Sequence, residues 1–254
     1  MRSFVRVGGV RHHVEVAGRG PVCVLSAGLG LVSADWDAVA ELLTPWRTVV
    51  RFDRPGLGLS GHARVPPSLV GEAGRIAGLL DALEFSGPVT VVGHSLAGFH
   101  GEAFARLCPA RTAGLVLVDS SIEERLGHVR VPRVARVGGA RVGGAVLRGV
   151  GVSRAVGPVG VRRFLVQGAL LEYATYGDVA RELAALRGEF PLPEGVPVTV
   201  LAAYSRGSVR WLYRQRGLAA TLGATFRVAE PSGHLVMRDS PADVAEAVLA
   251  VRPA

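Results

Sequence analysis

Residues 93–98 (GHSLAG) place a serine between small residues, directly after the apolar run 89–92. A serine at a sharp turn from a strand into a helix presents its hydroxyl outward, and the helix N-terminus favours developing negative charge. The turn needs small residues two positions before and after the serine, because strand and helix approach closely there. Gly93 meets this need, and Ala97 adds one methyl group that we expect the turn to accept. Ser95 is therefore the candidate nucleophile.

The elements around the serine decide whether it lies on such a turn, since Gly and Ser also mark ordinary loops. Continuous apolar runs predict buried strands at residues 21–25, 48–52, 89–92, 114–118, 197–202 and 226–228. Apolar residues spaced three and four apart predict helices at residues 35–43, 73–83, 96–108 and 178–186, and from residue 241 onward. Strands that are apolar throughout and alternate with helices predict an α/β fold with a mostly parallel sheet covered on both faces.

The order and spacing of the motifs resemble the α/β-hydrolase superfamily. The similar stretches are residues 26–36, 52–60 (FDRPGLGLS), 93–98, 115–121 and 232–248. This resemblance implies the α/β-hydrolase fold, in which helices flank a mostly parallel central sheet and a cap is inserted between core strands. We therefore expect residues 1–120 and 191–254 to form the hydrolase core and residues 121–190 to form the cap.

The resemblance implies that His234 is the general base, on the loop between the last strand and the final helix. An imidazole with a pKa near ~6.5 can accept the serine proton and return it to a leaving group. Family members usually carry the triad acid after the strand that is here 197–202, but residues 203–208 contain no carboxylate. Some members carry the acid one strand earlier, where this chain has Asp119. We expect Asp119 to orient His234; Glu123 or a missing acid is the alternative.

Two backbone N–H groups are needed to stabilise the oxyanion that forms during acyl transfer. The residue after the nucleophile, Leu96, supplies one. The resemblance places the second at Leu29, where this chain has Ala27-Gly28 in place of the family's frequent His-Gly. Because the donor is backbone, we expect the oxyanion hole to be retained.

Several conspicuous residues fit structural roles better than chemical ones. Asp53 and Arg54 precede Pro-Gly in a loop, where charge-assisted hydrogen bonds would hold the backbone. Trp36 lies on an expected helix face and fits packing. Cys23 and Cys108 lie far apart without metal-ligand spacing, so they fit as small apolar side chains. We expect no metal and no cofactor.

Length and composition permit one substantial core. With 254 residues and 49% hydrophobic content, the chain needs neither disulfides nor metals to fold. It shows neither the apolar run of about 7 to 15 residues of a secretory signal nor the ~20 apolar residues of a membrane span. We therefore expect a cytoplasmic protein. All 29 basic residues are arginine, which indicates coding bias.

Positive charge is concentrated in the expected cap. Nine arginines and no acidic residue lie between residues 125 and 163. This charge would attract an anionic acyl substrate or rest on an anionic membrane surface, and the alternative is a solvated face with no partner. No recognition motif accompanies the charge, so we expect no nucleic-acid partner.

These observations predict a serine hydrolase, similar to carboxylic-ester hydrolases, that acts on a small-molecule acyl substrate. Ser95, His234 and Asp119 would cleave an ester, thioester, lactone or related acyl bond through an acyl-enzyme. One alternative is a non-hydrolytic enzyme with the same pocket, a cyclase or C–C bond lyase of a biosynthetic pathway, because fold does not fix reaction. A second alternative is a binding protein that has lost turnover.

Overall fold

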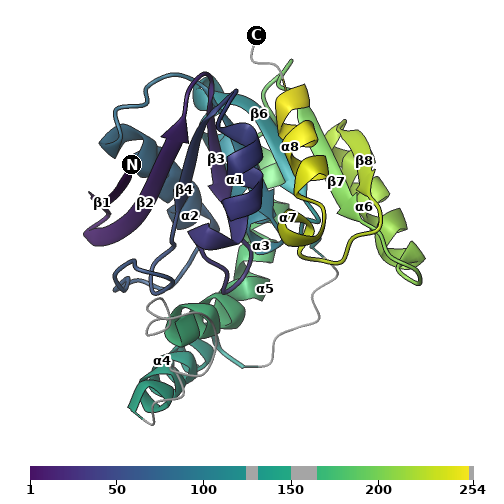
Figure 1. Ribbon diagram of the computed structural model, residues 1–254. Helices are drawn as coiled ribbons and strands as arrows, with labels where there is room; N and C mark the ends of the chain where they lie inside the picture. The colour runs from purple at the N-terminus through teal and green to yellow at the C-terminus, as the bar shows by residue number, and fades with distance from the viewer. Residues whose placement is uncertain (124–130, 150–164, 252–254) are drawn as a thin grey trace.

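The computed structural model describes residues 1–123, 131–149 and 165–251. An eight-stranded sheet runs through the molecule in the order β1-β2-β4-β3-β5-β6-β7-β8 (Figure 1). β2 pairs antiparallel with β1 and β4, and the other neighbours are parallel, which confirms the predicted fold class. The strands are β1 (Arg2–Val7), β2 (Val10–Gly18), β3 (Val22–Ser26), β4 (Thr48–Phe52), β5 (Val89–His94), β6 (Thr112–Val118), β7 (Val198–Ala203) and β8 (Thr225–Ala229).

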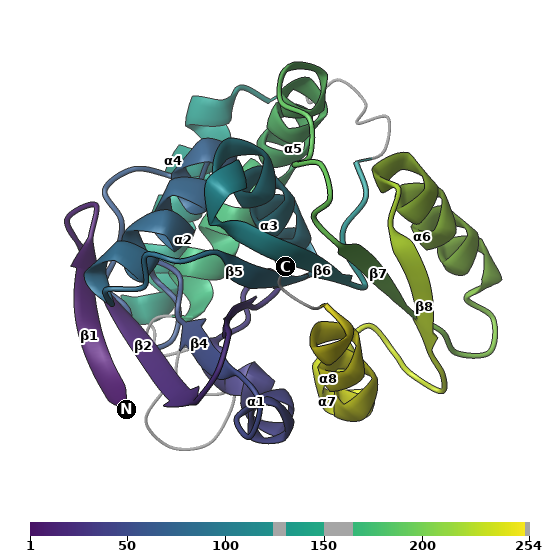
Figure 2. The ribbon, with the colours of Figure 1, turned by 90° about the horizontal axis from the view of Figure 1, so that it is seen from above.

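Helices cover both faces of this sheet. α1, α7 and α8 lie on one face, and α2, α3, α5 and α6 lie on the other (Figure 2). None of the helices that the structure describes combines the length and hydropathy needed to cross a bilayer. The α-helices are α1 (Asp37–Leu43), α2 (Leu69–Ala82), α3 (Leu96–Leu107), α4 (Arg133–Gly149), α5 (Leu165–Glu189), α6 (Val209–Leu222), α7 (Val236–Asp239) and α8 (Pro241–Ala250); the 3-10 turns are η1 (Ser33–Trp36) and η2 (Pro109–Arg111).

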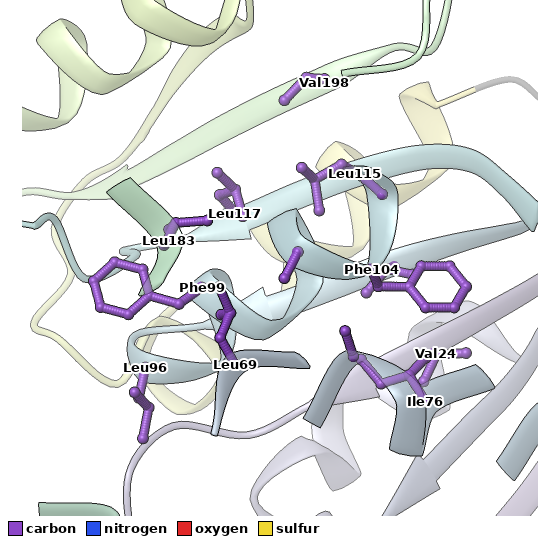
Figure 3. Packing of buried hydrophobic residues seen from close by; sticks show 14 of the residues in the cluster. Val24, Leu69, Ile76, Leu96, Phe99, Phe104, Leu115, Leu117, Leu183 and Val198 are labelled. Carbon is purple, nitrogen blue, oxygen red and sulfur yellow. The ribbon is translucent and has the colours of Figure 1, made fainter. Parts of the chain in front are cut away.

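The buried apolar side chains form one cluster on each face. The cluster under α2 and α3 includes Phe99 and Phe104, which pack with residues of β6 and with Leu183 of α5 (Figure 3). The second cluster surrounds Trp36 and Leu43 beneath α1 and α8, so Trp36 packs as expected. Each fully buried side chain of this size stabilises the fold by about 1.5–3 kcal/mol. The sheet is thereby a rigid base for the loops at its ends.

Helix α5 belongs to two parts of the molecule. Its second half packs into the main core through Val179 and Leu183, and its first half lies beside α4, away from the sheet (Figure 1). Residues 124–130 and 150–164 of the expected cap lie outside the described residues. The division between core and cap at residues 121 and 190 stays a prediction.

Several elements were not predicted from the sequence, among them α4, α7, the β1–β2 hairpin and α6. The β1–β2 hairpin turns at Gly8 and Gly9, both with positive φ, and β1 alternates between exposed and half-buried residues at the sheet edge. α6 exposes Arg210 and Arg216 and ends at Gly223, whose φ of 62° is typical of a left-handed helix cap. Neither the hairpin nor α6 has a long apolar run.

The parallel strands bring several loops to one edge of the sheet. Carboxyl ends of parallel strands lie at the same edge, where α/β proteins place their ligands. The loops after β3, β5, β6, β7 and β8 therefore meet there, and these loops carry the residues singled out in the sequence.

Candidate active site

Ser95 lies on the sharp turn that its neighbours predict. His94 ends β5, Leu96 begins α3, and Ser95 between them has φ 52° and ψ −122°. A non-glycine residue in this region is strained, and such strain is concentrated at functional sites. A Cβ on Gly93 would lie 2.3 Å from the carbonyl oxygen of Ala97, so glycine is required where strand and helix approach.

The main chain of Ser95 is tied to its surroundings on both sides. Its N–H donates to the carbonyl of Val118 on the neighbouring strand at 3.1 Å. Its own carbonyl accepts from the N–H groups of Gly98 at 2.9 Å and Ser121 at 3.1 Å. These bonds hold the strained conformation and fix the direction of the hydroxyl.

Three side chains from three loops meet beside this turn. Nε2 of His234 lies 3.1 Å from Oγ of Ser95, and Nδ1 of His234 lies 2.6 Å from Oδ2 of Asp119. An ionised carboxylate only accepts, so Nδ1 donates to Asp119 and Nε2 is left to accept the serine proton. The Asp119 side chain is 2% exposed, whereas the His234 side chain is 54% exposed. This geometry suits proton transfer from Ser95; which role each residue performs stays a prediction.

Asp119 reaches the place where the family's usual acid would lie. Its Oδ1 accepts from the backbone N–H of Ala203 at 2.9 Å, directly at the end of β7, and from Nε1 of Trp211 at 2.6 Å. Asp119 also has a φ of 40°, uncommon for a residue with a side chain. Trp211 of α6 is a site residue that no motif in the sequence singled out.

The expected oxyanion loop passes close to the nucleophile. A Cβ on Gly28 would lie 2.6 Å from Nδ1 of His94 and 3.1 Å from Cβ of Ser95, so the loop approaches with bare backbone. Leu96 is the first residue of α3, and its N–H has no acceptor inside the helix. Among the described residues, none accepts a hydrogen bond from the N–H of Leu29.

Arg54 holds this loop through its carbonyls. Its guanidinium donates to the carbonyl of Ala27, and its Nη2 donates to the carbonyl of Gly28 at 2.6 Å. The preceding residue, Asp53, holds the following loop, since its carboxylate accepts from the N–H groups of Ser33 at 2.7 Å and Leu59 at 2.9 Å. Both charged residues thus fix backbone, as the sequence indicated.

His94 lies between the histidine and oxyanion sides of the site. Its Nε2 donates to the carbonyl of His234 at 2.7 Å, because a carbonyl can only accept. Burial, helped by the neighbouring His234, lowers the pKa of His94 to about 4. The ring is therefore neutral at pH 7.

The remaining candidates lie elsewhere. Glu123, the alternative acid, is ion-paired with Arg187 of α5. Burial raises the pKa of the Cys23 thiol to about 12, and Cys23 and Cys108 are both free cysteines. No group of three or more His, Cys, Asp or Glu side chains in the described part of the chain is arranged to hold a metal ion.

Two of the hollows on the described surface differ in their distance from the candidate catalytic residues. One of about 310 Å³ adjoins the histidine and acid, with Ser205, Ser208 and Trp211 in its wall beside Asp119 and His234. A larger one of about 710 Å³ lies between the β1–β2 hairpin and α2, and none of the three candidate catalytic residues lines it. The smaller hollow is therefore the one that the candidate chemistry can use.

Of the nine arginines between residues 125 and 163 of the expected cap, three have side chains that the structure describes. Arg133 and Arg136 pair with Asp178 at 3.5 Å and 2.9 Å, and Nη2 of Arg141 donates to the carbonyl of Arg64 at 2.7 Å. The attraction of an anionic substrate or membrane stays a prediction, because the other six arginines lie outside the described side chains: Arg125, Arg130, Arg148, Arg154, Arg162 and Arg163.

Comparison with known proteins agrees with this architecture. A family model described as the Alpha/beta hydrolase family matches residues 23–247. An uncharacterized protein of Mycobacterium tuberculosis strain H37Rv is 27% identical over 272 residues, covering 94% of this chain and 77% of that protein. A poly(3-hydroxyalkanoate) depolymerase of Ectopseudomonas oleovorans is 37% identical over 97 residues, 38% of this chain and 32% of that protein. The solved enol-lactonase of Burkholderia xenovorans LB400 superposes with a TM-score of 0.74 at 21% identity, covering 98% of this chain and 99% of the other.

Proposed function

The chain belongs to the alpha/beta hydrolase family and is an enzyme of the hydrolase kind, and from this premise we propose that it is a serine hydrolase of acyl bonds. The bond it cleaves is an ester, thioester, lactone or related acyl linkage. The observation that carries the proposal is the contact series from Ser95 through His234 to the buried Asp119, at 3.1 Å and 2.6 Å.

Acylation begins at the hydroxyl of Ser95. His234 takes the hydroxyl proton on Nε2 while Oγ attacks the acyl carbonyl carbon, and Asp119 holds the imidazole in the required tautomer and stabilises the imidazolium. The tetrahedral intermediate collapses as His234 returns the proton to the leaving oxygen or sulfur. The products are a free leaving group and an acyl-Ser95 enzyme.

Deacylation repeats the same steps with water. His234 removes a proton from water, the resulting hydroxide attacks the acyl carbon, and the proton returns to Ser95 as the acid leaves. In both stages the N–H groups of Leu29 and Leu96 stabilise the oxyanion, a contribution of about 2.7–4 kcal/mol per donor in comparable sites. No cofactor takes part in these two reaction stages.

The substrate class follows from the cap as well as the triad. Residues 121–190 act as a cap that shapes the pocket, and the arginines between residues 125 and 163 favour a small acyl substrate with an anionic group. Lactone cleavage, the activity in the name of the Burkholderia neighbour, falls within this class.

The binding-protein alternative depended on the missing acid after β7. The contact between Asp119 and His234 provides a carboxylate where that acid would act, which favours turnover over binding alone. The cyclase or lyase alternative has no feature of its own among the described residues.

A fluorophosphonate probe tests the nucleophile directly. We expect stoichiometric labelling of the wild-type protein and none of Ser95→Ala, with p-nitrophenyl ester hydrolysis lost in the same variant. Ser120→Ala is the matched control, because Ser120 is buried close by and bonds only within its own loop through its hydroxyl. A wild-type protein that resists the probe would favour the binding alternative.

A further inference from the structure

An ion pair beneath the candidate active site joins the first half of α5 to the oxyanion loop. Nε of Arg54 lies 2.6 Å from Oε1 of Glu172, and Nη2 of Arg54 lies 3.0 Å from Oε2. The two residues are 118 positions apart in sequence, and their side chains are 3% and 4% exposed. Glu172 therefore reaches from the cap side of the molecule into a buried place beneath the site.

Glu172 also binds the oxyanion loop itself. Its Oε2 accepts the backbone N–H of Gly30 at 2.9 Å. Arg54, which Glu172 holds, donates to the carbonyls of Ala27 and Gly28. The residues immediately before and after Leu29 are thus fixed by one carboxylate, directly at Gly30 and through Arg54 at Gly28.

The backbone of α5 is seated against the same loops. A Cβ on Gly168 would lie 2.7 Å from the carbonyl oxygen of Gly56, and a Cβ on Gly30 would lie 3.1 Å from Cβ of Ala169. Such separations leave no room for an intervening side chain. A shift of the first half of α5 therefore moves the oxyanion loop or breaks its contacts with Glu172.

Stability alone is a poor reason for this arrangement. Burying two charges is expensive, and well-packed apolar residues often replace such a pair without loss. Burial also opposes the charge on Arg54, but Glu172, together with Glu72 and Asp53, outweighs burial and raises the pKa of Arg54. Apolar residues could not supply the hydrogen bonds that Glu172 and Arg54 make to the backbone on both sides of Leu29.

We propose that Glu172 is a positioning residue for catalysis, which aims the N–H of Leu29 at the oxyanion through Gly30 and Arg54. The inference rests on the proposed function, since it assigns that N–H to the oxyanion hole. Under this proposal, the oxyanion hole is complete only when the first half of α5 packs against the loop. Glu172 does not touch substrate and moves no proton.

A positioning role affects the transition state more than the bound substrate. In Glu172→Gln one oxygen becomes an NH₂ group, so one of the donors, Gly30 or Arg54, loses its acceptor. The loop then relaxes, and misplacement of about 1 Å can reduce turnover about 100-fold. We expect kcat for p-nitrophenyl butyrate to fall about 10- to 100-fold, with KM changed by less than about threefold.

The matched control is Glu182→Gln. Glu182 lies on the same helix, and its Oε2 accepts the backbone N–H of Leu69 at 2.7 Å, so it also ties α5 to the core. It makes no contact with the oxyanion loop. We expect kcat within about twofold of wild type in this variant, and an equal loss of kcat in both variants would overturn the proposal.

A transition-state analogue separates positioning from general loosening. An arylboronic acid forms a tetrahedral adduct with the serine that occupies the oxyanion hole, so its inhibition constant should rise in proportion to the loss of kcat/KM in Glu172→Gln. The fluorophosphonate probe should still label this variant completely, at a lower rate. Unchanged boronate affinity would overturn the proposal.

A second variant covers the case in which Glu172→Gln folds poorly because it leaves Arg54 without its anion. Arg54→Gln combined with Glu172→Gln removes both charges, and near-UV circular dichroism reports whether it folds. The folded double variant should keep the low kcat and weak boronate binding, and recovery of wild-type kcat would overturn the proposal. If Ser95→Ala retains activity, the proposed function itself fails; if Ser95→Ala is inactive and Glu172→Gln is fully active, only the role of Glu172 fails.

Discussion

The two sides of Ser95 are built in different ways. On the histidine side, His234 and Asp119 lie on short loops at the ends of core strands, and Asp119 is held by the backbone of Ala203. On the oxyanion side, the loop that carries Leu29 follows β3 and is held by Arg54, two residues after the end of the neighbouring strand β4. It depends on Arg54 and on Glu172 of α5, 142 positions along the chain from Gly30.

The sheet alone therefore positions the histidine side, whereas the proposed oxyanion side also depends on the first half of α5. The histidine side needs only the correct strand order, because neighbouring strand ends bring its residues together. The oxyanion side needs α5 in its place as well. Variants of the histidine side should therefore remove catalysis without unfolding the protein. Variants of the oxyanion side should change stability and turnover together.

The largest expected effect is on the histidine side. Asp119→Asn should lower kcat for p-nitrophenyl ester hydrolysis about 10⁴-fold, because the amide favours the wrong tautomer of His234. The melting temperature should change by only a few degrees, since the amide oxygen can still accept. Asp239→Asn is the control, because Asp239 binds the N–H of Gly233 on the same loop but not the imidazole ring. Full activity of Asp119→Asn would remove Asp119 from the triad.

On the oxyanion side, Arg54→Met should unfold more easily. It leaves the Glu172 carboxylate buried without its cation, a change that costs about 3–5 kcal/mol in unfolding free energy. Arg227→Met is the control, because Arg227 pairs with the exposed Glu246 and should contribute about 0–1 kcal/mol. Urea unfolding monitored by circular dichroism measures both. Equal midpoints for the two variants would contradict the dependence of this side on the buried pair.

Acid should lower the unfolding free energy of the protein through two buried histidines, His94 beside the site and His100 in α3. Burial lowers the pKa values of His94 and His100 from 6.5 to about 4. Between these pKa values the unfolded chain binds more protons than the folded protein does. The unfolding free energy is therefore highest above about pH 6.5 and falls as the pH drops toward 4. The loss reaches about 3 kcal/mol for each histidine. Urea unfolding between pH 7.5 and 4 tests this, and His94→Gln should show a shallower dependence than the wild type; an identical slope would contradict the contribution of His94.

The smallest expected effect concerns the second donor to Asp119. Trp211→Phe keeps an aromatic ring but removes the 2.6 Å bond from Nε1 to Oδ1, while the N–H of Ala203 still donates to that oxygen. We expect kcat about tenfold lower, since a hydrogen bond to a charged group contributes roughly 1.5–3 kcal/mol. Trp46→Phe, at an exposed tryptophan, is the control. Equal kcat values would show that the backbone donor suffices.

Much of the fold could be predicted because its signals are local. Strands such as β5 and β6 are continuous apolar runs, and the turn at Ser95 requires small residues such as Gly93 for steric reasons that act within a few positions. The edge strand β1 and the half-exposed helix α6 escaped prediction because neither carries a strong apolar pattern. Trp211 was missed together with α6.

The sequence by itself determined the parallel α/β core and selected Ser95, His234 and Asp119 as candidates, partly through a family resemblance. Only the tertiary structure decided that Asp119 lies against the end of β7 and that Glu172 lies against Arg54. The physical reason is range. Steric limits and apolar periodicity act between residues a few positions apart, so they can be recognised in the amino-acid sequence. The Glu172 carboxylate lies 118 positions from Arg54 and contacts it only after the sheet and α5 have packed.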